Sequence, residues 1–313
     1  MEKETPWILF LAYVLLLLFL DFFVLHKKGE QPTIKRAIFE TIFFVNNALL
    51  FSFFIYWVYD AAIIDNINNL KPGDAVVKYL TGYFIELSLS VDNLFVIAII
   101  FTSFKIPTRY QHKLLFLGIL GAIVFRAILI TVGLVLIKKV HGMNIIFGLF
   151  LLYTAFKMLK KEAEHEAVSE PKSIMKLFRI SNTFDRGRFI TVINGKWVFT
   201  GLFGALLAIE FTDLLFALDS IPAIFAITTD PFLVYSSNIF AILGLRSLYF
   251  FLSNMLEKFK YLKYSVFAIL VFVSIKLMSA NFVKIPEWFS LLFIGLSLII
   301  GIYVSVINIK KTN

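Results

Sequence analysis

Long apolar runs dominate this chain and restrict its possible folds more than any other feature. A transmembrane α-helix needs about 20 consecutive, mostly apolar residues to cross the hydrocarbon core of a bilayer. The hydrophobic share of 59% also exceeds the roughly 45–50% that is typical of soluble domains, so the excess apolar surface must face lipid. The sequence therefore predicts an all-α, polytopic membrane protein with about nine transmembrane helices. The runs that would form them are 7–25, 37–59, 79–104, 114–137, 143–159, 197–227, 234–256, 262–279 and 288–308.

The charged residues indicate how these helices are oriented. The first run, 7–25, is interpreted as a retained span and not a signal peptide, because its leader MEKET has no net positive charge and no small-residue cleavage site follows it. Twenty of the 30 Lys and Arg residues fall in segments on one side of the predicted membrane, and six fall on the other. The positive-inside rule then places the N-terminus outside and the C-terminus in the cytoplasm, in the plasma or inner membrane. The net charge of +9 thus reflects topology, and no nucleic acid is expected as a partner.

Two halves of the chain resemble each other. The segments SVDNLFVIAIIF, GAIVFRAIL and YTAFKML of the first half correspond to ALDSIPAIFAIT, AILGLRSLYF and FVSIKLM of the second. Each half holds three spans, an odd number, so the second copy must be inverted relative to the first, as in many secondary transporters. The predicted division is 1–74 for two N-terminal helices, 75–160 for the first three-helix repeat, 161–196 for a cytoplasmic linker, 197–280 for the second repeat and 281–313 for the last helix. The matched residues are Asp92 with Asp219, Arg126 with Arg246, and Lys157 with Lys276.

Acidic and polar residues gather within two of the apolar runs, 79–104 and 197–227. An ionisable group at mid-bilayer costs about 3 kcal/mol or more, so it persists where a partner or a water-filled path receives it. Five carboxylates exceed the two arginines that would balance their charge, Arg126 and Arg246, and protons or cations must offset the remainder. Oxygen ligands without Cys or His suit a hard divalent ion such as Mn²⁺, Mg²⁺ or Ca²⁺. The predicted metal ligands are Glu86, Asp92, Asn93, Glu210, Asp213, Asp219 and Ser220.

The two helices that carry these ligands are predicted to be interrupted. A six-residue step, as from Glu86 to Asp92, rotates a side chain by about 120° on a straight helix, so one unbroken helix cannot aim both at one point. Pro222 also lacks a backbone donor and crowds the carbonyl of Leu218. Unwound backbone at mid-membrane would then supply carbonyl ligands.

Other charged residues in the apolar runs are assigned structural roles. Asp21 is expected at a membrane interface, and Glu40 is expected to pair with Arg36. Lys157 and Lys276 lie near the ends of their spans, so their side chains are expected to extend toward the headgroups.

The acidic blocks ELSLSVDNLFVIAIIF and AIEFTDLLFALDSIPAIFAITTDPF, followed by SNIFAILGLRSLYF, resemble the TerC family of integral membrane proteins. The resemblance covers 7–308, and the length and span pattern resemble the family's Alx-like members. It implies a metal-ion transporter associated with manganese export, metal homeostasis and tellurium resistance. Glu86 and Asp92 match the first acidic motif of the family, and Glu210, Asp213 and Asp219 match the second.

Three functions are compatible with these residues. The leading one is Mn²⁺ efflux in exchange for protons, in which the metal ion is the substrate and there is neither an enzymatic activity nor a resident cofactor. Asp92 and Asp219 could instead form the acid pair of an intramembrane aspartyl protease, although the glycine-flanked motif of such proteases is missing. A third possibility is a non-transporting assembly or metal-stress partner of other membrane proteins, which would dock through 160–196.

Overall fold

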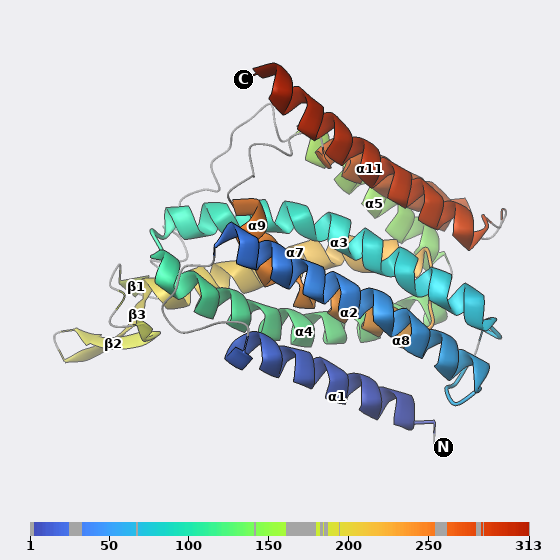
Figure 1. Ribbon diagram of the computed structural model, residues 1–313, viewed down its shortest axis with the longest axis horizontal. Helices are drawn as coiled ribbons and strands as arrows, with labels where there is room; N and C mark the ends of the chain where they lie inside the picture. The colour runs from blue at the N-terminus through green and yellow to red at the C-terminus, as the bar shows by residue number, and fades with distance from the viewer. Residues whose placement is uncertain are drawn as a thin grey trace.

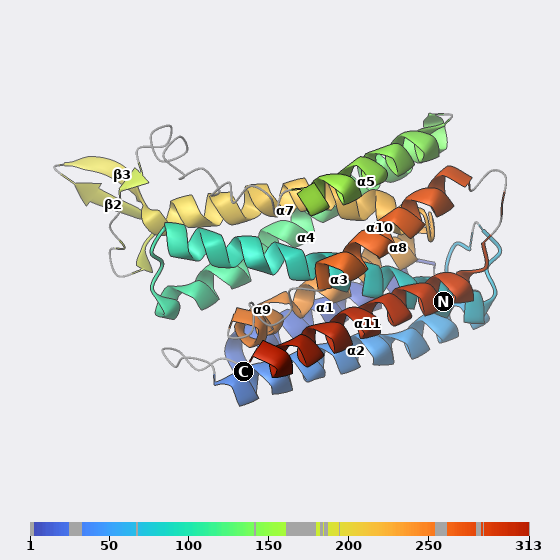
Figure 2. The ribbon, with the colours of Figure 1, turned by 90° about the horizontal axis from the view of Figure 1, so that it is seen from above.

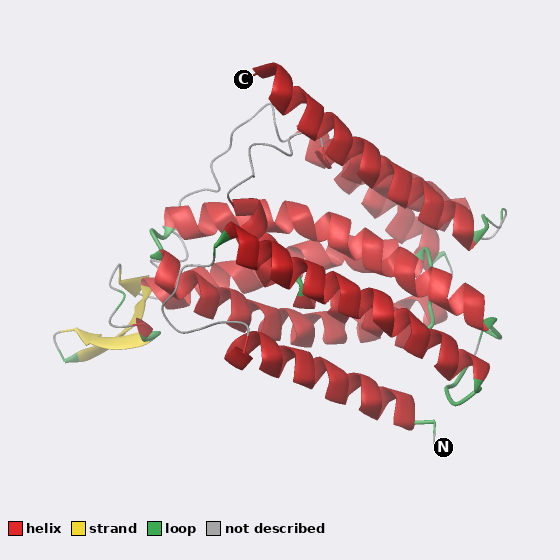
Figure 3. Cartoon of the chain, in the orientation of Figure 1, coloured by secondary structure: helices red, strands yellow, loops and turns green. Residues whose placement is uncertain are grey.

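The computed structural model shows a bundle of long helices with one small β-sheet at its end (Figures 1 and 3). It describes residues 3–24, 33–66, 68–140, 142–160, 180–181, 184, 187–193, 195–253, 262–279, 283 and 285–312. Within these ranges, the side chains of several helical residues, Asp92 and Asp219 among them, lie outside the description.

The helices coincide with the apolar runs. Six of them are long and apolar enough to cross a membrane, so the predicted all-α membrane fold is confirmed; the count of nine crossings and the inverted repeat stay predictions. A π-helical turn, Leu20–Val24, continues the first helix. In chain order the helices are α1 (Thr5–Phe19), α2 (Ile34–Asp60), α3 (Pro72–Ser103), α4 (Thr108–Lys139), α5 (Met143–Lys160), α7 (Gly201–Phe225), α8 (Pro231–Leu243), α9 (Leu245–Ser253), α10 (Leu262–Ser279) and α11 (Glu287–Thr312).

Local sequence signals set where several helices begin. The Thr33 side chain accepts a hydrogen bond from the Arg36 backbone N–H at 3.4 Å and caps α2. The Asp230 carboxylate accepts one from the Phe232 N–H at 3.0 Å and caps α8, whose first residue is a proline. These caps satisfy backbone donors that have no partner inside the helix.

The pair α8–α9 forms the centre of the bundle. In the span Pro231–Phe251, 89% of the apolar window is buried by other parts of the protein, against 22–33% in the other five candidate spans. The ring of Phe240 in α8 contacts Phe51 of α2 and Phe10 of α1, with ring centroids 4.5 and 6.3 Å apart. Helices α3 and α4 also pack on α8. The other candidate spans therefore keep one face for lipid, whereas α8–α9 is enclosed by protein.

The peripheral helices expose large apolar side chains, as lipid contact requires. Helix α11 lies at the edge of the bundle (Figures 1 and 2), and its Tyr303 is 65% exposed. Phe53 of α2 is 72% exposed. A continuous apolar surface of this kind marks a membrane contact and not a water-facing surface.

The helices that carry the acidic residues are not interrupted. Both α3 and α7 are continuous through their acidic residues, so that prediction is wrong, and with it the expectation of free backbone carbonyls there. Pro222 lies only three residues before the end of α7, where it removes a single intrahelical hydrogen bond. Helices α8 and α9 meet at Gly244, which keeps helical backbone angles, so they form one span, Pro231–Phe251.

A three-stranded sheet extends beyond the helix ends (Figure 2). Its strands are β1 (Ile180–Ser181), β2 (Ile190–Ile193) and β3 (Lys196–Thr200), in the order β1-β3-β2. The predicted span 197–227 therefore begins too early, because 197–200 belong to a strand and the helix starts at Gly201. The signal overlooked in the sequence is the Asn-Gly pair at 194–195 between two β-prone segments, which favours a tight hairpin. Gly195 has the positive φ of +73° that such a turn demands.

Candidate metal site

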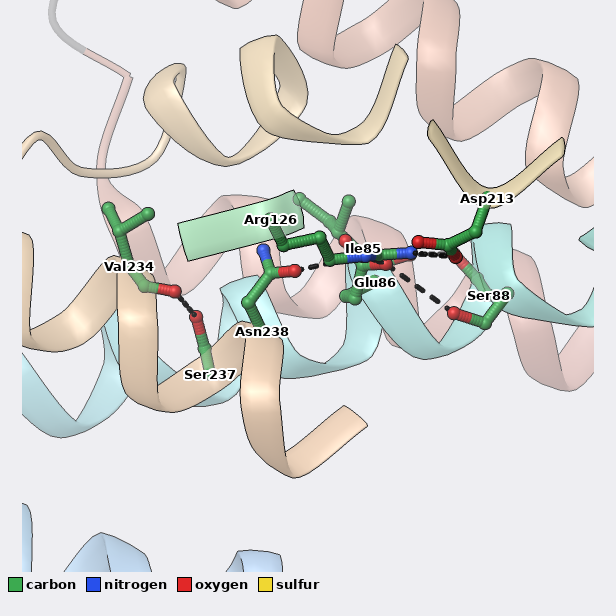
Figure 4. Close-up of polar contacts among 9 residues, drawn as sticks. Ile85, Glu86, Ser88, Arg126, Asp213, Val234, Ser237 and Asn238 are labelled. Atoms are coloured by element: carbon green, nitrogen blue, oxygen red, sulfur yellow. Dashed lines mark hydrogen bonds and ion pairs between the residues drawn. The ribbon is translucent and has the colours of Figure 1, made fainter. Parts of the chain in front are cut away.

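Arg126 connects four helices in the interior of the bundle. It lies in the middle of α4 and is 1% exposed. Its Nη1 donates hydrogen bonds to Glu86 of α3 and, at 2.8 Å, to Oδ1 of Asn238 in α8. Its Nη2 donates to Oδ1 of Asp213 in α7 at 3.1 Å. Figure 4 shows the planar guanidinium between these three partners. The positively charged side chain of Arg126 thus joins acids from the two halves of the chain.

Glu210 extends this group along α7. It precedes Asp213 by three residues, so both carboxylates project from the same face of the helix. Its carboxylate occupies the space that a Cβ atom on Gly121 of α4 would fill. Glycine at this position lets the carboxylate approach the α4 backbone, five residues before Arg126. We call Glu86, Arg126, Glu210, Asp213 and Asn238 the Arg126 cluster.

The carboxylates of the Arg126 cluster retain unused acceptor atoms. Oε2 of Glu86, Oε2 of Glu210 and Oδ2 of Asp213 are buried and make no hydrogen bond within the described part of the chain. A buried polar atom without a partner costs about 1–3 kcal/mol, and a charged one costs more. Three carboxylates beside one guanidinium leave two negative charges when all are ionised. The cluster therefore has both the free oxygens and the charge to accept a divalent cation, or protons in its place.

The remaining predicted ligands lie further along α3 and α7. Asn93 and Ser220 are buried, and no described residue hydrogen-bonds to the Ser220 hydroxyl. Asp92 and Asp219 belong to the helices, but their side chains are outside the described set. Among the side chains that are described, no three Asp, Glu or His residues are grouped closely enough to hold a metal ion by themselves. The described acids are therefore part of a site and not a complete coordination shell.

Arg246 occupies a different place from Arg126. Its Nη2 pairs with the carboxylate of Asp21 and also donates to the Asp21 backbone carbonyl at 2.8 Å. Asp21 lies in the π-helical turn after α1 and is 2% exposed, so it is buried against neighbouring helices, and its expected position at a membrane interface stays a prediction. Glu40 of α2 interacts electrostatically with Arg246, and it accepts a hydrogen bond from Arg36 at 3.1 Å, as expected.

Asp21, Glu40 and Arg246 form a second polar group, the Arg246 cluster, between the N-terminal helices and α9. The two intramembrane arginines thus have separate counterions among the described residues: Arg126 pairs with two predicted metal ligands, and Arg246 pairs with the N-terminal helix. Lys276 also differs from expectation, because it is 6% exposed and donates to the Ser290 hydroxyl at 2.9 Å instead of reaching the headgroups. Lys157 is exposed near the end of α5.

Sequence reasoning overlooked Asn238 and Gly121. Asn238 is fully buried in α8 and carries the only neutral side chain that the structure shows hydrogen-bonded to Arg126 among the described residues. The run YSSN inside an otherwise apolar span signals such a polar contact. Gly121 was visible as a small residue five positions before Arg126, but nothing local indicated which side chain would approach it.

Comparison with known proteins identifies the family. The model of the integral membrane protein TerC family matches residues 71–313. This chain belongs to the TerC family. It is therefore a multi-pass integral membrane protein, and the resemblance of the two acidic blocks is confirmed.

Several relatives match this TerC protein over nearly their whole length. An uncharacterized membrane protein of Rickettsia bellii is 40% identical over 305 residues, which cover 96% of this chain and 97% of the relative. An uncharacterized membrane protein of Myxococcus xanthus is 44% identical over 289 residues, with 91% and 86% covered. The putative membrane-bound redox modulator Alx of Escherichia coli is 37% identical over 306 residues, with 96% and 92% covered. No solved structure matches this chain.

Proposed function

We propose that this TerC protein is a transporter that exports Mn²⁺ across the plasma or inner membrane, in exchange for protons. The observation that carries this proposal is the set of buried carboxylate oxygens without partners on Glu86, Glu210 and Asp213. Two uncompensated negative charges inside an apolar bundle call for a doubly charged cation or for protons. If Mn²⁺ and protons occupy the carboxylates in turn, the protein exchanges one for the other across the membrane.

The ligand chemistry favours a hard ion. Carboxylate, amide and hydroxyl oxygens suit Mn²⁺, Mg²⁺ and Ca²⁺, whereas softer ions prefer sulfur or imidazole. The full predicted ligand set adds Asp92, Asn93, Asp219 and Ser220 to the three acids. The choice of manganese and the outward direction rest on the family resemblance, with the N-terminus outside and the C-terminus in the cytoplasm as the basic residues indicate.

The name of the Escherichia coli relative suggests a redox role, which would have to be indirect in this chain. The sequence contains no cysteine, so thiol exchange by its own side chains is impossible. Control of a redox-active metal ion is a route that the acidic cluster supports. A transporter of Mn²⁺ therefore agrees both with the acidic cluster and with the redox role in the name of the Escherichia coli relative.

The cellular manganese content after a manganese load tests the proposal. We expect the wild-type protein to lower that content in a host lacking its own manganese exporters, and Asp92→Asn and Asp219→Asn to abolish this effect. The matched control is Asp74→Asn, which removes an exposed carboxylate from the first turn of α3 and is expected to export normally. Equal manganese contents with every variant, with the proteins present in the membrane, would reject manganese export.

Gly121→Ala is expected to reduce manganese export several-fold without preventing membrane insertion. A Cβ atom at this position would overlap the Glu210 carboxylate, which must then leave its place beside Asp213. Gly295→Ala in α11 is the control, because a Cβ there meets no atom within 4 Å. Both changes raise helix propensity by about 1 kcal/mol, so that effect is shared. Equal export by the two variants would contradict the assigned role of Glu210.

A further inference from the structure

Arg126 takes up the same carboxylates that the transported ion would need. Its guanidinium uses one oxygen of Glu86 and one oxygen of Asp213, and the second oxygen of each remains without a partner. These acids come from α3 and α7, one from each predicted repeat. A cation that enters between them meets a positive charge already in place.

We propose that Arg126 is a built-in competitor for the metal ion: it closes the empty site by bridging Glu86 and Asp213, and it lowers the affinity of the loaded site so that the ion can leave. This inference rests on the proposed metal transport. It assigns to Arg126 a positioning role in the transport cycle that goes beyond balancing charge.

The charges of the described cluster fit this role. Without metal, the three carboxylates and Arg126 carry a net charge of −2 when ionised, and one divalent cation brings the sum to zero while the arginine stays. Without Arg126 the empty cluster would carry −3. The metal ion would then be attracted more strongly, and it would be released less readily. Transport requires binding that is favourable enough to load the ion but weak enough to let it go.

Asn238 gives the guanidinium a place to remain when the metal ion arrives. Its Oδ1 accepts from Nη1 of Arg126 at 2.8 Å, on the α8 side of the cluster (Figure 4). Because the amide is neutral, this hydrogen bond can hold the arginine without adding a further negative charge to the site. Arg126 can thus give up its bonds to Glu86 and Asp213 and keep one partner inside the protein.

A static role for Arg126 makes a different prediction. If the arginine only fastened the helices together, its removal would destabilise the protein with or without metal, as the removal of any buried ion-pair partner does. If it competes with the metal ion, then added Mn²⁺ should replace the missing positive charge. The stabilisation by Mn²⁺ should therefore be larger in a variant that lacks the arginine.

The test is thermal unfolding of the purified full-length protein across a range of Mn²⁺ concentrations, with wild type, Arg126→Gln and Arg246→Gln. We expect wild type to be stabilised modestly and Arg126→Gln to start less stable but to gain the same stabilisation at a Mn²⁺ concentration at least tenfold lower. A ligand that binds only the folded state stabilises it by RT ln(1 + [L]/Kd), so the Mn²⁺ concentration that gives a fixed gain in stability reports the affinity. Arg246→Gln is the matched control, because it also breaks a buried arginine–aspartate pair but should show the wild-type response to Mn²⁺.

The outcomes separate this inference from the proposed function. If Mn²⁺ stabilises neither wild type nor Arg126→Gln, the metal site itself is refuted. If both gain the same stabilisation at the same Mn²⁺ concentration, or if Arg246→Gln gains as much affinity as Arg126→Gln, the site stands but the competing role of Arg126 is overturned. Arg126→Lys keeps the charge but not the two-armed geometry, and it covers the case in which Arg126→Gln does not fold; the Mn²⁺ concentration that it needs for the same gain should lie between those of wild type and the glutamine variant. A lysine variant that needs the same Mn²⁺ concentration as wild type would mean that bridging of Glu86 and Asp213 is not needed.

Discussion

Glu86→Gln is expected to reduce manganese export at least tenfold while the protein remains folded in the membrane. Glutamine keeps an oxygen that can accept the hydrogen bond from Arg126, so the helix contacts around the cluster persist. The described cluster, however, falls from two uncompensated negative charges to one, and a divalent cation is no longer neutralised there. The loss of one charge in a site of low dielectric constant has a far larger effect than the same change at a surface.

The measurement is manganese efflux from preloaded cells, together with the amount of protein in the membrane. Glu4→Gln is the control, because Glu4 is exposed before α1 and makes no side-chain capping bond. Export by Glu86→Gln at the wild-type rate would show that the Arg126 cluster is not part of the ion path. The site would then have to be sought around Asp92 and Asp219 alone.

Arg246→Leu is expected to destabilise the protein by about 3–5 kcal/mol, the typical effect of removing one partner of a buried ion pair. Asp21 is 2% exposed, so its carboxylate would lose its counterion without gaining access to water. The paired substitution Asp21→Asn with Arg246→Leu should recover much of this loss, because it leaves no buried unpaired charge. Together with the single variant Asp21→Asn, these substitutions complete a double-mutant cycle that measures the coupling between the two residues.

Thermal unfolding in detergent, combined with the yield of folded protein, measures this effect. The exposed pair of Lys3 and Asp65 is the comparison, because its side chains are 70% and 63% exposed and solvent screens their attraction. Lys3→Gln should therefore change the unfolding temperature little. A single Arg246→Leu variant as stable as wild type would show that Asp21 does not depend on Arg246 for its burial.

The membrane class could be predicted, and so could the presence of charged residues inside the apolar runs, because both are local properties of the sequence. A run of about 20 apolar residues forms a spanning helix wherever it lies in the chain, since every backbone polar group must be satisfied inside the segment. The internal similarity likewise singled out the two acidic blocks without knowledge of the fold. The Asn-Gly pair at 194–195 was an equally local signal of a turn, which the apolar character of the following span obscured.

The partners of the charged residues depend on the tertiary structure. Arg246 meets Asp21 across 225 positions of sequence, and Arg126 meets Asn238 across 112. Helical periodicity gives the face of each side chain, but not which neighbouring helix covers that face or how far it is shifted along its axis. The prediction of broken acidic helices failed for the same reason. It assumed that the carboxylates must all point to one place from their own helices, whereas the long side chain of Arg126 reaches acids on two continuous helices, Glu86 on α3 and Asp213 on α7.

The sequence by itself therefore determined that this is a polytopic helical membrane protein of the TerC family with acidic residues inside two of its apolar runs. The tertiary structure decided that Arg126 lies between the acids of both halves, while Arg246 joins the N-terminal helix. The physical reason is that hydrophobic burial in a bilayer is governed by composition along the chain, whereas ion pairing is governed by distances of a few ångströms, which only the packing of helices against one another sets.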